Sequence, residues 1–456
     1  MDLIVVRHEA ARIARLAGPL VVAQLSQVGM GFTDTVMAGR LGVVDLGAVA
    51  IGSTLWIPIY LGCVGVMMAV SPTVAQLRGA GRPEAVGPLY RQSLWLSLIL
   101  ALLAFLATRH VSAFMYWLGI DPAIVPVTEG YLAAIAWGMP GACFYLGLRF
   151  VSEGIGHTRP IMYIQILALL VNIPGNWVFM YGALGVPAMG AVGAGWSSAM
   201  VLTLTGVAIV AYVALRPRFR PYRLFRRLDP PRWDTLQGLL RLGLPIALVI
   251  VMEVGLFTAV ALLMGSLGAV AVAAHQVAFN YAALVFMVPL GISMATTVRV
   301  GHLAGAGDRA GARLSGFLGM GMAVTAMLVS AVVMLSVPDL IVSMYTSETK
   351  VARLAVSLLF MAALFQVSDG LQASAVGALR GLKDTAYPMW VTFFAYWLVG
   401  LPLAWTLGIA QALGPRGLWV GLIAGLTIGA VLLSVRFHRI TRQPAARPGT
   451  EAGEPS

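Results

Sequence analysis

The chain has 456 residues, of which 59% are hydrophobic and 11% are charged. Soluble domains carry about 25% charged residues, so this composition excludes an ordinary soluble protein and indicates a polytopic membrane protein. The net charge of +12 would suit a nucleic-acid partner, but the positions of the basic residues follow membrane topology and exclude that partner class.

Apolar runs of about 20 residues, the length that crosses ~30 Å of hydrocarbon, recur along the whole chain. We predict an all-α polytopic membrane protein with about twelve transmembrane helices. The predicted spans are 13–38, 47–70, 88–108, 129–151, 160–181, 191–214, 239–264, 270–296, 313–336, 353–377, 385–408 and 416–438. The N-terminal segment leads directly into the first span and lacks the short apolar core and cleavage site of a secretory signal.

Basic residues are distributed unevenly between the predicted loops. If both termini are cytoplasmic, the only ones of the 30 that face outward are Arg40, Arg109, Lys350, Arg353 and Arg416. This is the positive-inside bias, and it predicts a multi-pass protein with cytoplasmic N- and C-termini. We expect the other basic residues to contact anionic membrane lipids, and we expect no nucleic-acid partner.

The two halves of the chain resemble each other. A shift of 226 residues places Pro19 on Pro245 and Gly29 on Gly255 without a gap. Six spans in each copy predict two pseudo-symmetric six-helix bundles, related as parallel repeats about an axis along the membrane normal. The predicted domains are an N-lobe at 1–215, a basic cytoplasmic linker at 216–235, a C-lobe at 236–440 and a disordered cytoplasmic tail at 441–456.

The glycine-rich turns between spans do not form a nucleotide site. Neither RGAGRP nor AGAGDRAGA ends in the Lys-Ser/Thr of a P-loop, and the chain has only two lysines, Lys350 and Lys383. No HExxH or GxSxG motif is present. We therefore expect neither ATP hydrolysis nor any other enzymatic activity, and no cofactor beyond a coupling ion.

Three carboxylates lie within the apolar spans: Asp34, Glu253 and Asp369. A charged side chain at the centre of a membrane helix costs about 2.5–3.5 kcal/mol on insertion scales, so such acids usually serve a function. We expect no Lys or Arg beside them. Unpaired acids in a membrane interior typically bind or relay cations, which predicts a cation-coupled transporter. Glu253 and Asp369 would repel each other if both were ionised, unless H+ or Na+ lies between them.

Several neutral polar residues are candidate partners of these acids. Gln27 shares a helix face with Asp34, seven residues away. Asn172 and Asn176 stand four residues apart in the fifth span, and Gln276 and Asn280 repeat this spacing in the eighth. Amide oxygens can ligate Na+ or relay protons, but amides also join helices by hydrogen bonds, and both interpretations stay open. An interfacial position for Asp34 is a further alternative.

At these residues the chain resembles the multidrug and toxic compound extrusion (MATE) family, in its bacterial NorM-like branch. The segments that carry the resemblance are QVGMGFTDTVMAGRLG at 27–42, VMEVGLF at 251–257 and FQVSDGLQASAVGALRGLKDT at 365–385. The resemblance implies two six-helix lobes in a V shape, in a bacterial inner membrane. It also implies efflux of small organic cations in exchange for inward H+ or Na+, by a chain that we expect to be a monomer.

The resemblance also implies roles for individual residues. The N-lobe acid of the family corresponds to Asp34 and its C-lobe pair to Glu253 and Asp369, where a Na+ ion could bind. Asn172, Asn176 and a hydroxyl at Ser198 correspond to polar groups of the N-lobe. Family members often place Tyr four residues before the C-lobe Asp, where this chain has Phe365. That loss of a hydroxyl favours H+ over Na+.

One other transporter class fits the architecture, a flippase for lipid-linked precursors. Its anionic pyrophosphate cargo would need Arg or Lys in the cavity, whereas this chain supplies acids there. Resistance to cationic dyes on expression would favour export, and impaired cell-wall synthesis would favour flipping.

Overall fold

A computed structural model describes residues 3–117, 119–227 and 229–442. The predicted tail lies outside the described residues except for its first two positions, 441 and 442. The described chain is helical and contains no strand, as predicted.

The first half of the chain contains ten helical segments. They are α1 (Leu3–Leu41), α2 (Val43–Met67), α3 (Val70–Gly79), η1 (Pro83–Ala85), α4 (Val86–His110), α5 (Ala113–Trp117), α6 (Val125–Ala136), α7 (Met139–Gly154), α8 (Arg159–Tyr181) and α9 (Ala191–Leu215). The short helix η2 (Pro217–Tyr222) follows in the linker.

The second half repeats this order, with α11 and α14 unbroken where the first half has α2 with α3 and α6 with α7. Its helical segments are α10 (Trp233–Ser266), α11 (Ala269–Gly305), α12 (Arg309–Ser336), α13 (Pro338–Ser343), α14 (Thr349–Gly381), α15 (Ala386–Thr392), η3 (Phe393–Gly400), α16 (Leu401–Trp405), η4 (Thr406–Ala410) and α17 (Gly414–Arg442). The segments from α15 to η4 form one span that contains two π-helical stretches, η3 and η4.

By length and apolar composition, 10 helices of the described residues can cross a membrane, and 11 can if α6 and α7, bent by 44°, form one span. The remaining predicted span belongs to α1, which has 39 residues but a polar stripe with Gln24 and Gln27 that lowers its apolarity. The chain is therefore a multi-pass membrane protein, and the prediction of about twelve spans depends on α1.

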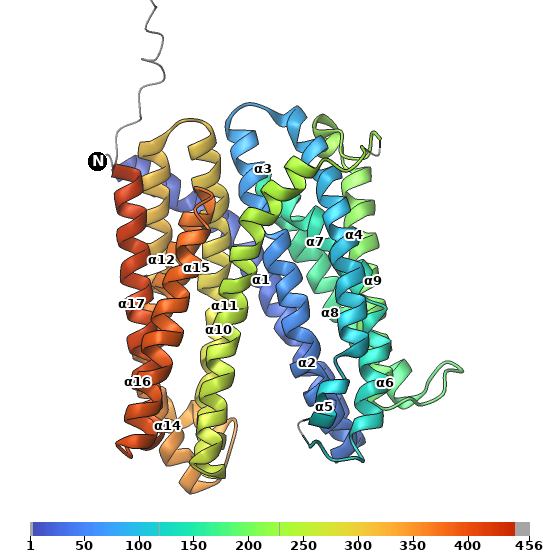
Figure 1. The fold of residues 1–456 in the computed structure, drawn as a ribbon, viewed down its shortest axis with the longest axis vertical. Coiled ribbons are helices and arrows are strands. Elements are labelled where there is room, and N and C mark those ends of the chain that lie inside the picture. Colours follow the sequence, from blue (N-terminus) through green and yellow to red (C-terminus); the bar gives the residue numbers. More distant parts are fainter. Residues whose placement is uncertain (1–2, 118, 228, 443–456) are drawn as a thin grey trace, which may run out of the picture.

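Figure 1 shows two helical bundles side by side. The linker, the start of α1 and the end of α17 lie at one end of the molecule, which we call the linker end. The bundles approach each other there and spread apart toward the end that carries α5 and α6, consistent with the expected V shape. The five basic residues predicted to face outward lie near helix ends away from the linker end, at the end of α1 or α4 or the start of α14 or α17.

Contacts between the two lobes are close at the linker end. A Cβ atom added to Gly79 of α3 would overlap the carbonyl oxygen of His302 in α11, so only glycine permits this approach. Gln76 of α3 donates a 2.8 Å hydrogen bond to the carbonyl oxygen of Gly381 in α14. Glu9 of α1 forms an ion pair with Arg299 of α11 at 2.8 Å. These contacts join the lobes through α1, α3, α11 and α14, and α2 also packs closely against α10, where Gly65 faces the backbone of Ala247.

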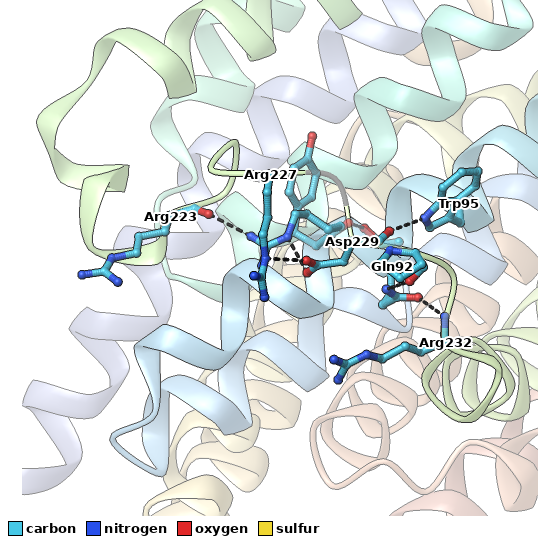
Figure 2. Close-up of polar contacts among 10 residues, drawn as sticks. Gln92, Trp95, Arg223, Arg227, Asp229 and Arg232 are labelled. Carbon is cyan, nitrogen blue, oxygen red and sulfur yellow. Dashed lines mark hydrogen bonds and ion pairs between the residues drawn. The ribbon is translucent and has the colours of Figure 1, made fainter.

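The linker is folded against the N-lobe (Figure 2). Asp229 accepts a 2.6 Å bond from Nε of Arg91 in α4 and pairs with Arg227 at 2.7 Å. Gln92 donates to the carbonyl oxygen of Pro230 at 2.8 Å and accepts from the backbone N–H of Arg232 at 2.7 Å. The domain boundaries predicted above stay a prediction, but the linker packs as part of the N-lobe surface rather than apart from it.

Candidate functional site

The N-lobe acid lies at the junction of three helices. Asp34 of α1 is partly exposed, and its Oδ1 atom accepts hydrogen bonds from Nδ2 of Asn172 at 3.0 Å and Nδ2 of Asn176 at 2.6 Å, both in α8. Its Oδ2 atom accepts a 3.3 Å bond from the hydroxyl of Ser198 in α9. The structure thus brings four predicted site residues into one cluster, which we call the N-lobe site.

Local sequence explains why α8 supplies two donors to one carboxylate. Asn172 and Asn176 are four residues apart and therefore share a helix face. Both are buried, and Pro174 lies between them inside the helix. The Oδ1 atom of Asn176 is buried without a hydrogen-bond partner. The cluster therefore surrounds a carboxylate with neutral donors and leaves one amide oxygen available.

Two residues in the interior of the N-lobe were not predicted. Tyr131 of α6 is buried and interacts electrostatically with Asp34, and its hydroxyl accepts a 3.1 Å bond from Nε1 of Trp56 in α2. Arg149 of α7 is buried and donates a 3.0 Å bond to Oε1 of Gln24 in α1. Neither residue stands in a polar pattern in the sequence, so only the packing of α6 and α7 against α1 and α2 could reveal them.

Gln27 lies apart from the N-lobe site. Its side chain is partly buried on α1 and makes no hydrogen bond within the described residues. Gln276 and Asn280 in α11 bond to each other at 2.8 Å, and both are exposed. The structure does not bring any of these three amides to the carboxylates, and a substrate-binding role for them stays a prediction.

The C-lobe acids lie close together at the meeting of α10, α14 and η3. Asp369 is buried, Glu253 is partly buried, and they interact electrostatically with each other. Neither carboxylate forms a hydrogen bond or an ion pair within 4.0 Å in the described part of the chain. We call this pair, together with Tyr396, the C-lobe site.

Tyr396 and Gln372 were not predicted. Tyr396 interacts electrostatically with Glu253 and Asp369, and its hydroxyl accepts a hydrogen bond from Nε2 of Gln372. Gln372 stands three residues after Asp369 and so shares its helix face, a signal that was present in the sequence. The sequence around Tyr396 contains no comparable spacing that would link this residue to the acids. It belongs to the π-helical stretch η3, and π-helical turns are frequent at functional sites.

The expectation that no basic residue lies beside the acids is wrong for the C-lobe. Arg380 of α14 is buried and interacts electrostatically with Glu253, although no ion pair forms within 4.0 Å. Its Nη1 atom contacts Sδ of Met68 at 3.2 Å, across the lobe boundary. Arg380 stood outside the predicted span of 353–377, and the longer helix α14 carries it into the protein interior.

Phe365 packs into an aromatic cluster. Its ring meets Phe257 edge-on at 5.9 Å and Trp419 at 5.6 Å between ring centroids. The ring supplies no oxygen ligand. Within the described residues, no group of three or more His, Cys, Asp or Glu side chains could hold a metal ion. A Na+ ion at Glu253 and Asp369 would therefore need backbone, amide or hydroxyl oxygens as further ligands.

Comparisons with known proteins agree with this architecture. The MatE family model matches residues 19–178 and 245–406, two stretches whose starts are separated by the offset of the internal repeat. The probable multidrug resistance protein NorM of Xanthomonas campestris pv. campestris is 44% identical over 94% of both chains. The multidrug resistance protein PmpM of Pseudomonas aeruginosa is 41% identical over 96% of this chain and 93% of its own.

Solved structures share the fold. The eukaryotic MATE transporter AtDTX14 superposes with a TM-score of 0.87 at 20% identity, over 96% of this chain and 99% of its own. The outward-facing conformation of a multidrug resistance MATE family transporter of the MOP superfamily gives a TM-score of 0.88 at 20% identity, over 95% and 96%.

Proposed function

The chain belongs to the MatE family of multidrug and toxic compound extrusion transporters, and on that premise we propose that it exports organic cations in exchange for H+. Members of this family are transporters and not enzymes. The alternative coupling ion is Na+. We further propose that the chain works as a monomer in a bacterial inner membrane, with both termini in the cytoplasm and without ATP.

The observation that carries this proposal is the surroundings of the three acids. Asp34 is held only by neutral donors, from Asn172, Asn176 and Ser198. Glu253 and Asp369 have no direct counterion within 4.0 Å in the described residues. Carboxylates held in this way bind a passing cation without first breaking an ion pair, whereas a structural acid would be locked to an arginine.

Alternating access follows from how the lobes touch. They contact each other at the linker end, and the positive-inside bias supports a cytoplasmic position for that end. We propose that protonation of Asp34, Glu253 or Asp369 releases a cationic drug to the outside. Loss of the proton to the cytoplasm then restores the negative charge that receives the next drug. Rocking of one lobe against the other would carry the site between the two sides.

The free energy available for export depends on how many protons enter for each cation that leaves. One H+ entering for each monovalent cation leaving is electroneutral and uses only the pH gradient, about 1.4 kcal/mol per pH unit. A second proton would add about 2.3 kcal/mol per 100 mV of membrane potential. The nonpolar ring of Phe365 supports H+ over Na+, because it removes an oxygen that a Na+ ion could use.

Efflux from proteoliposomes tests the proposal. A cationic dye is followed while either an H+ gradient or a Na+ gradient is imposed, with the membrane potential clamped. We expect the H+ gradient to drive dye transport in the native chain and not in Asp34→Asn or Asp369→Asn. Asp339→Asn, an exposed acid of α13, is the matched control and should transport normally. Unchanged transport after all three membrane acids are neutralised together would refute the proposal.

A further inference from the structure

One cavity lined by described residues is separate from the acidic sites. It has a volume of about 750 Å³ and opens at the linker end of the N-lobe, between the start of α8, the end of α9, η2 and α1. We call it the basic pocket. Its lining includes four arginines and one histidine: Arg15, His157, Arg159, Arg216 and Arg218. No acidic residue lines it.

These arginines differ from others at the linker end because no acid of the described residues pairs with them. Arg15, Arg159 and Arg218 make no hydrogen bond or ion pair within the described residues, and Arg216 only stacks over the ring of Tyr212 at 5.3 Å. By contrast, Arg299 pairs with Glu9, and Arg91 and Arg227 share Asp229. Four guanidinium groups around one cavity repel one another, and an anion between them would remove that repulsion.

The inner wall of the pocket adds neutral donors. Thr158 is buried at the start of α8, and its side chain does not cap the helix, which leaves backbone N–H groups free. His157 stands beside it, with its ring edge-on to Phe219 at 5.7 Å. Burial, together with the charges of Arg218 and Arg78, lowers the pKa of His157, so this side chain is neutral near pH 7. A phosphate group is an acceptor suited to such donors.

An apolar track leads away from the pocket along the membrane-facing surface. Tyr163, which lines the pocket, is 58% exposed, and Leu167 and Leu170 follow on the same face of α8, 47% and 60% exposed. Leu215, directly before Arg216, is 78% exposed. A free phosphate ion would have no use for this surface, whereas the acyl chains of a lipid would cover it.

We propose that the basic pocket binds the phosphate headgroup of an anionic phospholipid, with its acyl chains along Tyr163, Leu167 and Leu170. The guanidinium groups of Arg159 and Arg218 hold the phosphate oxygens, and Arg15 and Arg216 neutralise further charge at the rim. A basic pocket between helix ends on the cytoplasmic side is a suitable site for such a headgroup. The bound lipid would tie α1, α8 and η2 together.

Thermal unfolding of the purified full-length protein in nanodiscs tests this site. Phosphatidylcholine discs are compared with discs that contain increasing phosphatidylglycerol, and inorganic phosphate is added separately to phosphatidylcholine discs. We expect phosphatidylglycerol to stabilise the native chain in a saturable way. Arg159→Gln/Arg218→Gln should need at least tenfold more phosphatidylglycerol for half of this effect. The matched control Arg220→Gln/Arg226→Gln removes equal charge from exposed sites outside the pocket. It should change the amount of phosphatidylglycerol needed for half of the stabilisation by less than twofold.

Three results would overturn the proposal. Equal losses in both double variants would mean that the lipid senses only total charge. Full stabilisation by inorganic phosphate alone would mean that the site takes a free anion and not a lipid. If the double variant fails to fold, Arg218→Gln alone replaces it, and an unchanged response of that variant to phosphatidylglycerol would also contradict the site.

Discussion

The ion pair between Glu9 and Arg299 gives the sharpest mechanical prediction, because it joins the two lobes at the linker end. Glu9 accepts bonds from Nε and Nη2 of Arg299, both at 2.8 Å, and a 2.6 Å bond from the hydroxyl of Ser315 in α12. The side chains of Arg299 and Glu9 are only 14% and 7% exposed. Breaking a buried pair from one side costs about 3–5 kcal/mol. The amide in Glu9→Gln keeps part of the hydrogen bonding, so we expect a loss of about 2–3 kcal/mol.

This loss acts only on the state in which the lobes touch at the linker end. It should shift the equilibrium toward the separated state by about 30- to 150-fold. Spin labels at Ala80 of the N-lobe and Ala310 of the C-lobe, both exposed, report the distance across this end once buried Cys63 and Cys143 are replaced. We expect double electron–electron resonance to show a new, longer distance population in Glu9→Gln.

The control for this variant is Arg12→Gln. Arg12 contacts Glu9 at 3.4 Å within the same helix and its side chain is 62% exposed, so its loss should leave the distance distribution unchanged. A Glu9→Gln distribution identical to that of the native chain would refute the reasoning that this pair holds the lobes together.

Three further predictions follow from particular contacts. Gly79→Ala places a methyl group against the carbonyl of α11 and should increase the long-distance population of the same spin labels. Asn176→Ala removes the 2.6 Å bond to Asp34. A hydrogen bond to a charged group contributes about 1.5–3 kcal/mol, so we expect kcat/KM for dye efflux to fall by about 10- to 150-fold. The hydrogen bond from Arg91 lowers the pKa of Asp229 despite its burial. Linker docking should therefore persist as pH falls to about 4 and weaken below the usual carboxyl pKa, as measured by hydrogen exchange over 223–232.

Each of these has a matched comparison. Gly238→Ala adds the same methyl group to α10, where no atom lies within 4 Å, and should not alter the distances. Gln411→Ala removes an exposed amide between η4 and α17 and should keep efflux near normal. Asp234→Asn neutralises an exposed acid near the linker and should leave exchange unchanged. Equal effects in a variant and its comparison would contradict the contact assigned to that variant.

The parts of this fold that sequence could predict are those that depend on local properties. Span positions follow from runs of apolar residues, and Asp34, Glu253 and Asp369 stood out because charge in such runs is costly. The pairing of Asn172 and Asn176 on one helix face follows from helix geometry. These signals need no knowledge of which helices are neighbours.

The remaining site residues depend on contacts between distant helices. Tyr131, Tyr396 and Arg380 are near the acids only because α6, η3 and α14 pack where they do, and each looks ordinary in its own segment. The docking of the linker could not be predicted for the same reason, because Asp229 and Arg91 are 138 positions apart in the sequence. Such pairings are set by tertiary packing and not by spacing.

The most direct test of the central claim is ion displacement on substrate binding. A cationic dye is added to the purified protein in unbuffered detergent solution, and released H+ and Na+ are measured with electrodes. We expect release of about one H+ for each bound dye, and we expect this release to be lost when Asp34, Glu253 and Asp369 are all neutralised. Dye binding that releases neither ion from the native chain would contradict the central claim.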